Sequence, residues 1–381
     1  MITVKKNILV YQNPDFYSAF PGAAAAGDGR IALVFRRAPR YRGMPGLPYA
    51  WYTHLDRNSQ LMMTFSNDDG ATWEPPRLLY APPCGGSQDG GMYFDGKYLY
   101  ANTFVWGNLP DAVLDELRKT GNDEFIYSFG GSNVATHIGS VSFRSGDFGK
   151  TWEGPFHPEP LPGGLEALPG QPLRMHNRAN IIRSPEGTLL FPGQALRYRP
   201  KYLSSVVLYE SHDDGLTWQY LSTVADHRGE GVFEEPCLYI TPSGKFVMII
   251  RTHRGYDGNH LQRAQLYICE STDGGRTWTE PRDTGVHGEP ATACRLPDGR
   301  VLVAYGYRKP PEGVRARVCN PELTDFETAE EYIIRDDAGH ADVGYPWIVP
   351  LTDGTMMLFY YMNKKSFDGS GGIFASVLEV N

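Results

Sequence analysis

Short apolar runs recur along the chain in pairs, and each pair is joined by a turn that contains glycine. The turn glycines of the six pairs are Gly29, Gly96, Gly187, Gly244, Gly299 and Gly354. Successive turn glycines are 67, 91, 57, 55 and 55 residues apart. Apolar runs of this length, interrupted by Gly at the connection, predict β-hairpins whose strands are mostly buried. Recurrence of one such unit along the whole chain indicates a repeat architecture.

A second pattern, Ser-x-Asp-x-Gly-x-Thr-Trp, occurs four times between these hairpins. Its copies are SNDDGATW at 66–73, SGDFGKTW at 145–152, SHDDGLTW at 211–218 and STDGGRTW at 271–278. Asp followed by Gly predicts a tight turn, because Gly accepts positive φ and Asp bonds to nearby backbone. The Trp is expected to pack the turn onto the neighbouring sheet. We therefore interpret Asp68, Asp147, Asp213 and Asp273 as structural, and the spacing does not fit a calcium loop of EF-hand type.

These units predict an all-β fold. Two hairpins per unit make a four-stranded antiparallel sheet, and six sheets make a six-bladed β-propeller that spans residues 1–381 as one domain. The fifth unit has a degenerate turn at 314–326, and the segment 111–120, DAVLDELRKT, predicts a helix inserted in the second unit. The strand predicted within 2–11 is expected to pair with the C-terminal segment 376–380 and close the ring, which removes exposed sheet edges.

Composition narrows the class of protein and of partner. The chain has 381 residues, 41% of them apolar, with 43 Gly, 29 Pro and a net charge of −8. This charge argues against nucleic acid as a partner. No apolar run of about twenty residues is present, so no membrane-spanning helix is expected. Residues 1–12 lack a signal-peptide pattern, which predicts a cytoplasmic location.

The cysteines agree with that location. There are five, at positions 84, 237, 269, 294 and 319, and no Cys-x-x-Cys pair is present. An odd number of scattered cysteines argues against a disulfide framework or a zinc site. We expect them to behave as small buried apolar residues in a reducing compartment.

The candidate site lies about nine residues before each turn glycine, where the first strand of each unit begins. In a propeller these strands converge on the central channel. The residues there are Phe20 and Pro21; Gln88 and Asp89; His176 and Arg178; Glu234 and Glu235; His287 and Glu289; Asp342 and Tyr345. A solvated funnel rim would also be polar. Convergence of carboxylates, guanidinium groups and a phenol on one small surface favours a polar active site.

The eight-residue pattern resembles the Asp-box, or BNR repeat, of sialidases, and the predicted six-bladed layout resembles their fold over essentially the whole chain. The resemblance implies that Glu235 activates Tyr345 as a nucleophile. It implies that Arg251 and Arg308 bind a substrate carboxylate, with Arg315 and Arg317 as less favoured substitutes for Arg308. It also implies that Asp56 is the acid/base, a role for which His54 and Asp89 compete.

One position departs from the family pattern. Sialidases usually open the first blade with Arg-Ile-Pro, whereas this chain has YSAFPGAAA, with Phe20 before Pro21. Arg36 and Arg37, at the end of the following strand, are expected to reach the site from another direction. His176 and Arg178 match no family position and are candidates for recognising a different sugar. Glu234, Asp89 and Glu289 are expected to add polar contacts, and Trp51 and Trp106 are candidates for stacking on a sugar ring.

These residues predict a retaining, exo-acting glycoside hydrolase. A carboxylate next to a phenol lowers the barrier to attack by taking its proton, and an Asp protonates the leaving oxygen. A neutral attacker avoids repulsion with an anionic substrate, so we expect a terminal acidic sugar, sialic acid first, on a glycan or small glycoside. No metal or organic cofactor is implied.

Two alternatives stay open. One is a propeller lyase or hydrolase for a uronic acid or another sugar, which the missing first Arg favours. The other is a non-catalytic carbohydrate- or protein-binding propeller. The sequence does not fix the sugar, the linkage or the oligomeric state.

Overall fold

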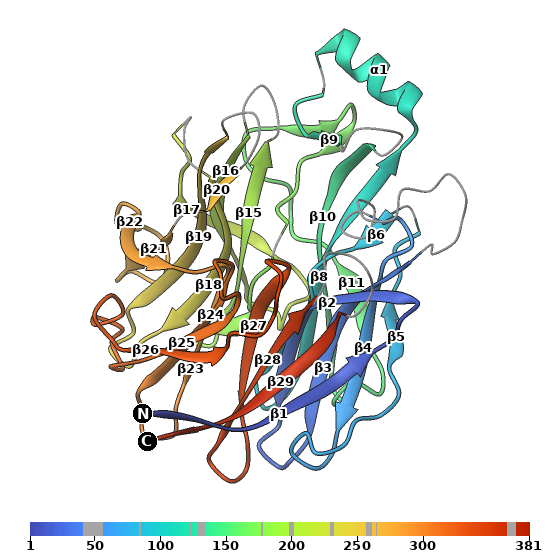
Figure 1. The fold of residues 1–381 in the computed structure, drawn as a ribbon. Helices are drawn as coiled ribbons and strands as arrows, with labels where there is room; N and C mark the ends of the chain where they lie inside the picture. Colours follow the sequence, from blue (N-terminus) through green and yellow to red (C-terminus); the bar gives the residue numbers. More distant parts are fainter. Residues whose placement is uncertain are drawn as a thin grey trace.

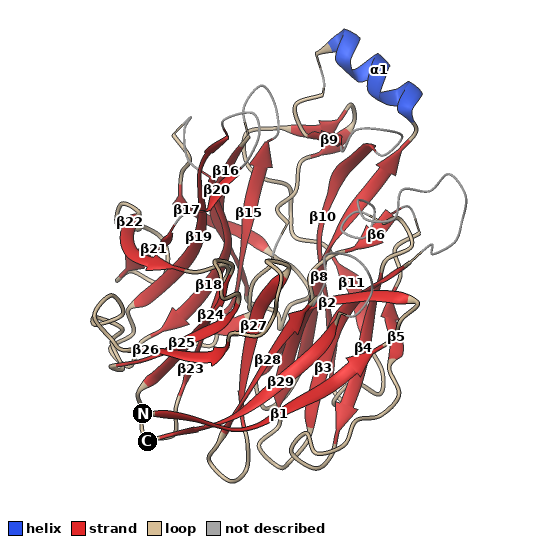
Figure 2. Cartoon of the chain, in the orientation of Figure 1, coloured by secondary structure: helices blue, strands red, loops and turns tan. Residues whose placement is uncertain are grey.

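The computed structural model describes residues 1–40, 56–83, 85–121, 123–128, 134–176, 178–197, 202–228, 232–256, 261–263, 265–363 and 371–381. Within them the chain is mostly β-strand with one short helix, as Figure 2 shows. The antiparallel sheets stand around a common centre in a β-propeller arrangement (Figure 1). The predicted all-β propeller class is thereby confirmed.

Three of the sheets have four strands each. The first contains β2 (Phe16–Ala25), β3 (Ile31–Pro39), β4 (Gln60–Ser66) and β5 (Arg77–Tyr80) in that order. The second contains β23 (Ala291–Arg295), β24 (Val301–Tyr307), β25 (Gly313–Cys319) and β26 (Glu331–Arg335). The third runs in the order β1 (Ile2–Gln12), β29 (Gly372–Val380), β28 (Met356–Met362) and β27 (Val343–Pro350).

The other sheets depart from the expected four strands. A six-stranded sheet contains β6 (Gly85–Ser87), β7 (Gly91–Phe94), β8 (Leu99–Leu109), β9 (Ile126–Ser128), β10 (Val134–Ser145) and β11 (Glu153–Phe156). A two-stranded sheet contains β12 (Glu166–Leu168) and β13 (Gln171–Pro172). A nine-stranded sheet contains β14 (Ile182–Arg183), β15 (Leu189–Arg197), β16 (Leu203–Ser211), β17 (Gln219–Ala225), β18 (Val232–Ile240), β19 (Phe246–Tyr256), β20 (Leu261–Arg263), β21 (Gln265–Ser271) and β22 (Arg282–His287).

The prediction of six separate four-stranded sheets was therefore wrong in detail. The nine-stranded sheet forms because β16 and β18 meet through a parallel bridge, Ser204 with Val232, between two otherwise antiparallel halves. The second unit gains strands because two short segments, β6 and β7, both pair with β8, and β9 adds to β10. These pairings join segments that the hairpin pattern does not relate to one another.

Both predictions about the ends and the insertion are confirmed. Strand β1 pairs antiparallel with β29, from Ile2 opposite Val380 to Gln12 opposite Gly372. The two termini consequently lie side by side (Figure 1). The helix α1 (Asp111–Thr120) ends at Gly121, whose φ of 73° suits glycine at a helix end. It projects from the sheets at the top of Figure 1.

The four repeated turns have one hydrogen-bond pattern. In each, the Ser hydroxyl donates to the Asp Oδ1 at 2.7–2.8 Å and accepts the Gly N–H at 2.7–3.0 Å. The Thr backbone N–H donates to Asp Oδ1 at 2.8–2.9 Å, and its hydroxyl donates to Oδ2 at 2.5–2.7 Å. Both carboxylate oxygens are thus used within the turn. The structural interpretation of the four Asp residues is confirmed.

Two of the turn Trp residues contact a neighbouring sheet, as expected. Trp218 is 2% exposed, and its indole N–H donates to the hydroxyl of Ser142 on β10 at 2.9 Å. The ring of Trp73 packs edge-on against Phe359 on β28, with centroids 5.7 Å apart. Between the sheets, apolar side chains interdigitate to form the core, for example Val34 and Leu61 with Val141. The turns therefore fasten neighbouring sheets to one another.

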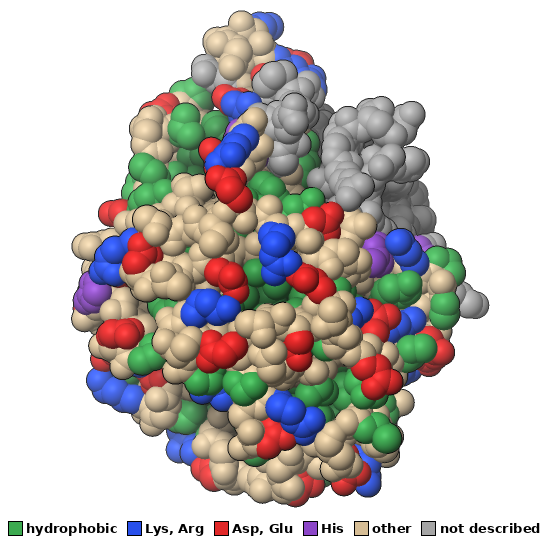
Figure 3. Space-filling model, turned by 90° about the vertical axis from the view of Figure 1, so that its left-hand side faces the viewer, with side chains coloured by type: hydrophobic (Ala, Val, Ile, Leu, Met, Phe, Trp, Pro, Cys, Tyr) green, Lys and Arg blue, Asp and Glu red, His purple; other side chains and the backbone are tan. Residues whose placement is uncertain are grey.

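The described cysteines are free thiols. Cys237, Cys269 and Cys319 are buried, as predicted, whereas Cys294 is half-buried. Cys84 lies outside the described residues. On the surface, basic and acidic side chains are interspersed over the face that Figure 3 presents. The described part contains no helix long and apolar enough to cross a membrane.

Candidate active site

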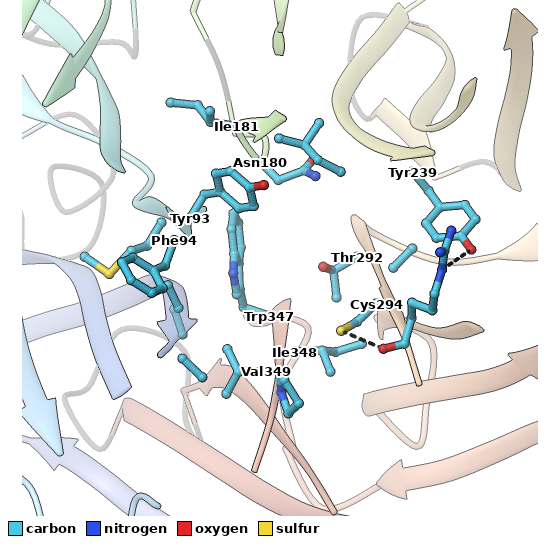
Figure 4. Close-up of a pocket in the computed structure, with 18 of the residues that line it drawn as sticks. Tyr93, Phe94, Asn180, Ile181, Tyr239, Thr292, Cys294, Trp347, Ile348 and Val349 are labelled. Atoms are coloured by element: carbon cyan, nitrogen blue, oxygen red, sulfur yellow. Dashed lines mark hydrogen bonds between the residues drawn. The ribbon is translucent and has the colours of Figure 1, made fainter. Parts of the chain in front are cut away.

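The inner ends of the sheets surround a central cavity. Its volume is about 470 Å³. Six chain segments line it: 23–25, 92–94, 180–182, 238–240, 292–295 and 347–350. Figure 4 shows side chains from these segments, including Tyr93, Asn180, Tyr239, Thr292 and Trp347, arranged around one hollow. Each segment lies two to five residues after one of the predicted channel-mouth residues, so those residues gather at one end of this channel.

Three inner strands carry a bulge at that end. The antiparallel register shifts between Ala19 and Gly22, between Glu234 and Cys237, and between Gly344 and Trp347. The bulges place Phe20, Glu235 and Tyr345 at φ values of 57°, 49° and 53°. Positive φ is unfavourable for residues with a Cβ, and bulges re-aim side chains next to functional sites. Each of the three residues precedes a proline, which cannot donate to the ladder.

Glu235 and Tyr345 meet directly. The Tyr345 hydroxyl donates a hydrogen bond to Glu235 Oε1, although the two residues are 110 positions apart in the chain. The Glu235 backbone N–H donates to the side-chain oxygen of Gln194 at 2.7 Å, which fixes the bulge. Burial, together with the negative charge of Glu235, holds the pKa of Tyr345 well above its usual value. The phenol is therefore protonated at rest, and its acceptor is already in place.

Arg251 is the central cation of the site. Its Nη1 donates to Glu235 Oε2 at 2.5 Å and to the Tyr345 hydroxyl at 3.3 Å. Its Nη2 lies 3.0 Å from Glu289 Oε2, and its Nε lies 3.4 Å from Glu234 Oε1. Burial alone would lower the pKa of this guanidinium, but the three carboxylates raise it well above its usual value. Arg251 is therefore a permanent charge that faces the Tyr345 oxygen.

Arg308 extends this network to the next sheet. Its Nη1 lies 3.3 Å from Glu289 Oε2, and its Nε donates to the Val343 carbonyl at 3.0 Å. Its Nη2 donates to the Tyr361 hydroxyl at 3.4 Å. Tyr361 in turn donates to the Asp342 carboxylate at 2.7 Å. One connected network thus runs from Tyr345 through Arg251, Glu289, Arg308 and Tyr361 to the buried Asp342, which immediately precedes β27.

Asp89 is buried, and its Oδ1 has no hydrogen-bond partner within the described structure. Burial and the nearby charge of Glu235 raise the pKa of Asp89 well above its usual value, although Arg178 and Arg36 oppose this. Burial and a nearby like charge both disfavour the ionised form of a carboxyl group. Asp89 is therefore a candidate proton donor. The family resemblance had given this role to Asp56, with Asp89 as a competitor.

Asp56 is buried and takes part in a local turn. Its Oδ1 accepts the Asn58 backbone N–H at 2.7 Å, and its carbonyl accepts the Ser59 N–H at 3.0 Å. These bonds form a turn just before β4. Arg36 lies near enough for the charges of Asp56 and Asp89 to raise its pKa, while burial lowers it to about 10. His54 lies outside the described residues.

The two neighbouring arginines on β3 point to different surroundings. Arg36 is fully buried and donates to the Ser87 carbonyl at 3.0 Å, on the side that faces Asp89. Arg37 stacks over Phe16 and donates to the side chain of Gln60 at 2.9 Å. Since successive side chains of a strand alternate between faces, only one of them can face the channel. The structure brings Arg36, and not Arg37, towards the site.

Arg178 does not present its charge to an open site. It is 3% exposed, and it donates to the Ala291 carbonyl at 3.1 Å and to the Pro346 carbonyl at 2.8 Å. Its guanidinium lies 5.2 Å from the ring centre of Tyr345 and 5.4 Å from that of Trp347. It therefore lies next to Tyr345 and is bonded to Pro346, the residue that follows Tyr345.

His176 lies in an aromatic cluster to one side. Its ring stacks on His137 with centroids 3.7 Å apart and an interplanar angle of 10°. Burial lowers its pKa to about 3, so the ring is neutral. Trp106, 8% exposed, packs beside the same pair and is a buried residue rather than an open platform. Trp51 lies outside the described residues.

The two substitutes for Arg308 lie elsewhere. Arg315 donates to the Pro311 carbonyl at 3.0 Å, and Arg317 donates to the Tyr305 hydroxyl at 2.9 Å. Sequence reasoning missed Gln194 and Tyr361 as partners of the site. Both follow a turn glycine by seven residues, as Arg36 and Arg251 do. That offset marks the end of a second strand and was the available signal.

Comparisons with known proteins agree with this arrangement. Residues 118–364 match a family model described as a BNR repeat-like domain. A protein of unknown function from Dyadobacter fermentans is 35% identical, with a TM-score of 0.88 over 100% of this chain and 99% of that one. No curated protein matches the sequence.

Solved sialidases share the fold at lower identity. A Hadza microbial sialidase is 16% identical, with a TM-score of 0.61 over 94% of this chain and 65% of that one. The Trypanosoma rangeli sialidase is 14% identical, with a TM-score of 0.60 over 95% of this chain and 55% of its own. The family match covers well over half of the sequence, and the turns, sheets and structural neighbours agree with it. The chain therefore belongs to the BNR repeat-like domain family, and it shares its fold with solved sialidases.

Proposed function

We propose that the protein is a retaining, exo-acting glycoside hydrolase in which Tyr345 is the nucleophile and Glu235 its base. The observation that carries this proposal is the buried hydrogen bond from the Tyr345 hydroxyl to Glu235 Oε1. Both residues stand on bulged inner strands at positive φ, a backbone state with an energetic cost that clusters at functional sites. A Tyr–Glu pair held in this way is a nucleophile with its base in reach.

The first step forms a bond between the Tyr345 oxygen and the anomeric carbon of the sugar. As that bond forms, the phenol proton passes to Glu235, and the glycosidic C–O bond breaks. Arg251 Nη1, 3.3 Å from the Tyr345 oxygen, stabilises the negative charge that develops on it. In the second step water attacks the anomeric carbon, the Tyr345–sugar bond breaks, and Glu235 returns the proton to the phenol.

We assign the proton donor to Asp89, with Asp56 as the second candidate. Asp89 is buried, and its raised pKa favours the protonated form, which is the state that a general acid needs. It would protonate the leaving oxygen and then remove a proton from the attacking water. Asp56 is committed to its own turn through the Asn58 N–H. Loss of the acid should affect glycosides with poor leaving groups far more than activated aryl glycosides.

The test is a screen of aryl glycosides with the parent, Tyr345→Phe and Glu235→Gln. We expect both variants to lose at least about 1,000-fold in kcat/KM on every substrate that the parent cleaves, since removing a nucleophile or its base disables the first step. Tyr332→Phe is the matched control, because Tyr332 also donates to a carboxylate, that of Glu330, but on the exposed surface. Turnover that survives Tyr345→Phe would contradict the proposal.

A further inference from the structure

Arg36 carries a positive charge that the described part of the chain leaves unpaired. Its side chain is fully buried, and its Nε donates to the Ser87 carbonyl at 3.0 Å. Its two terminal nitrogens, Nη1 and Nη2, have no hydrogen-bond partner among the described residues. Burial lowers the pKa of Arg36 to about 10, so the group is still a cation at neutral pH. A buried charge is costly unless it is paired, so these two nitrogens indicate a binding position for an anion.

This guanidinium lies on the Asp89 side of the channel mouth. Ser87, which accepts the Arg36 Nε–H, stands two residues before Asp89 in the chain. The charges of Arg178 and Arg36 both act on Asp89, and they oppose the effect of burial on its pKa. The bonds of Arg178 to backbone carbonyls leave its positive charge in place, because a carbonyl is neutral. Two cations therefore stand beside the proposed proton donor.

Tyr345 has different neighbours. The ring of Phe20 packs against it, with centroids 4.6 Å apart. The cation nearest to its oxygen in the network above is Arg251, whose Nη1 lies 3.3 Å away. Arg251 is already paired with three carboxylates, those of Glu234, Glu235 and Glu289. The anomeric carbon must approach Tyr345 during attack, so an anion on that carbon would meet an apolar ring and a cation that is already paired. An anion elsewhere on the substrate can use Arg36.

The segment that carries Asp89 also offers hydrogen-bond acceptors to a sugar. Gln88 Oε1 and Asp89 Oδ1 are buried atoms that have no partner in the described structure. Buried polar groups in folded proteins are normally hydrogen-bonded, and each sugar hydroxyl has one O–H to donate. Unpaired donors on Arg36 and unpaired acceptors on 88–89 therefore fit a ligand that has both an anionic group and hydroxyl groups.

We propose that Arg36 binds an oxyanion, a carboxylate or a sulfate, that the substrate carries away from its anomeric carbon. This rests on the proposed glycosidase function, and it favours a uronide or a sulfated sugar over one whose carboxylate is on the anomeric carbon. A guanidinium fork matches two oxygens of such a group, and hydrogen bonds between charged partners are stronger than neutral ones. Arg37 points away from this position, stacks on Phe16 and bonds to Gln60.

The test uses sets of 4-nitrophenyl galactosides and glucosides, in both anomers, that differ only in one group: CH2OH, carboxylate, or CH2OH esterified with sulfate. A 4-nitrophenyl α-sialoside, whose carboxylate is on the anomeric carbon, is added. We expect the parent to cleave an anionic member of a set with a kcat/KM at least about 100-fold above that of the neutral member, as loss of a charge-assisted contact would imply. The carboxylate and sulfate arms show which oxyanion is bound.

Arg36→Met should reduce this ratio at least about 10-fold, and Arg36→Lys, which keeps the charge but loses the fork, should fall between that variant and the parent. Arg37→Met is the matched control on the same strand, and it should keep the ratio of the parent. Urea unfolding separates binding from a structural role. Arg36→Met should unfold at a urea concentration no lower than the parent does, because it removes an unpaired buried charge.

The outcomes separate the two proposals. Preference for a neutral member or for the sialoside would overturn the inference and keep the glycosidase, and so would an anionic preference that Arg36→Met leaves intact. If no glycoside is cleaved, the glycosidase proposal fails, and calorimetry with galacturonate, glucuronate and galactose 6-sulfate against galactose and glucose decides the rest.

Tighter binding of the anions by the parent, lost in Arg36→Met and kept in Arg37→Met, would support the inference. Equal binding of anionic and neutral sugars, or no binding, would overturn it. If Arg36→Met does not fold, the comparison of the parent with Arg36→Lys decides.

Discussion

The repeated turns at the outer edge and the residues at the channel mouth use similar side chains in opposite ways. In the turns, every Asp oxygen is bonded within eight residues of sequence, and the pKa of Asp68 is lowered to about 2 by bonds from Thr72 and Ser66. At the channel mouth, Asp89 is buried with its pKa raised, and Tyr345 finds its acceptor 110 residues away. The turns bond all of their Asp oxygens locally and hold neighbouring sheets together, whereas the channel mouth keeps a buried polar atom, Asp89 Oδ1, without a partner in the described structure.

The largest expected effect is on stability, and it tests whether the turns hold neighbouring sheets together. Trp218→Ala should lower the free energy of unfolding by about 3–5 kcal/mol, because it empties a buried site and removes the bond to Ser142. The kcat of a cleaved glycoside should change less than about two-fold. Trp152→Ala is the matched control. Trp152 is half-buried in the equivalent turn, so its truncation should lower the free energy of unfolding by less. Urea unfolding measures the free energy of unfolding, and steady-state kinetics measure kcat. A large loss of kcat in folded Trp218→Ala would contradict the view that the turns serve stability alone.

The next effect tests Arg178 as a positioning residue for Tyr345. Arg178→Met frees the Ala291 and Pro346 carbonyls and loosens the bulge, so we expect kcat to fall about 100-fold, or about 2.7 kcal/mol, with KM nearly unchanged. Arg178→Lys should recover part of the loss.

The control for this prediction is Arg315→Met. Arg315 is also buried and donates to three backbone carbonyls, but it stacks on Tyr307 instead of Tyr345. Both variants should lose stability, and only Arg178→Met should lose kcat. Equal effects on kcat would mean that Arg178 acts through general stability alone.

The smallest effect concerns the dependence of stability on pH. The folded pKa of Asp89 is raised, so the native state holds a proton that the unfolded state releases above about pH 4. Stability of the parent should therefore fall as pH rises through this window. The loss in free energy of unfolding should be up to about 1.4 kcal/mol per pH unit. Asp89→Asn should remove this dependence.

Asp68→Asn should behave in the opposite sense. The folded pKa of Asp68 is lowered to about 2, so its contribution is present above the unfolded pKa and disappears as pH falls. The parent should exceed this variant in stability at pH 7, and the difference should vanish in acid. Urea unfolding from pH 3 to 8 measures both variants, and slopes of the same sign would contradict the account of Asp89.

The outer edge could be predicted from sequence because its contacts are local. The turn at Asp68 and the helix at 111–120 are encoded by a few adjacent residues. The joining of two units through Ser204 and Val232 could not be predicted, since it depends on how whole sheets lean together.

The channel mouth was predicted as a set of residues but not as a set of roles. The offset from the turn glycines found Glu235, Tyr345 and Asp89, because first strands converge at the channel. It could not show that Arg178 bonds to backbone carbonyls or that Asp56 bonds within its own turn, since both depend on side-chain direction. Tyr361 was within reach of the same offset rule applied to second strands.

The most direct measurement is the mass of the protein during turnover. A glycoside that the parent cleaves would be mixed with the protein, the reaction would be quenched in acid within milliseconds, and the protein would be digested. The account predicts a glycosyl adduct on the peptide that contains Tyr345, absent from Tyr345→Phe. An adduct on another residue, or cleavage of that glycoside with inversion at the anomeric carbon, would contradict it.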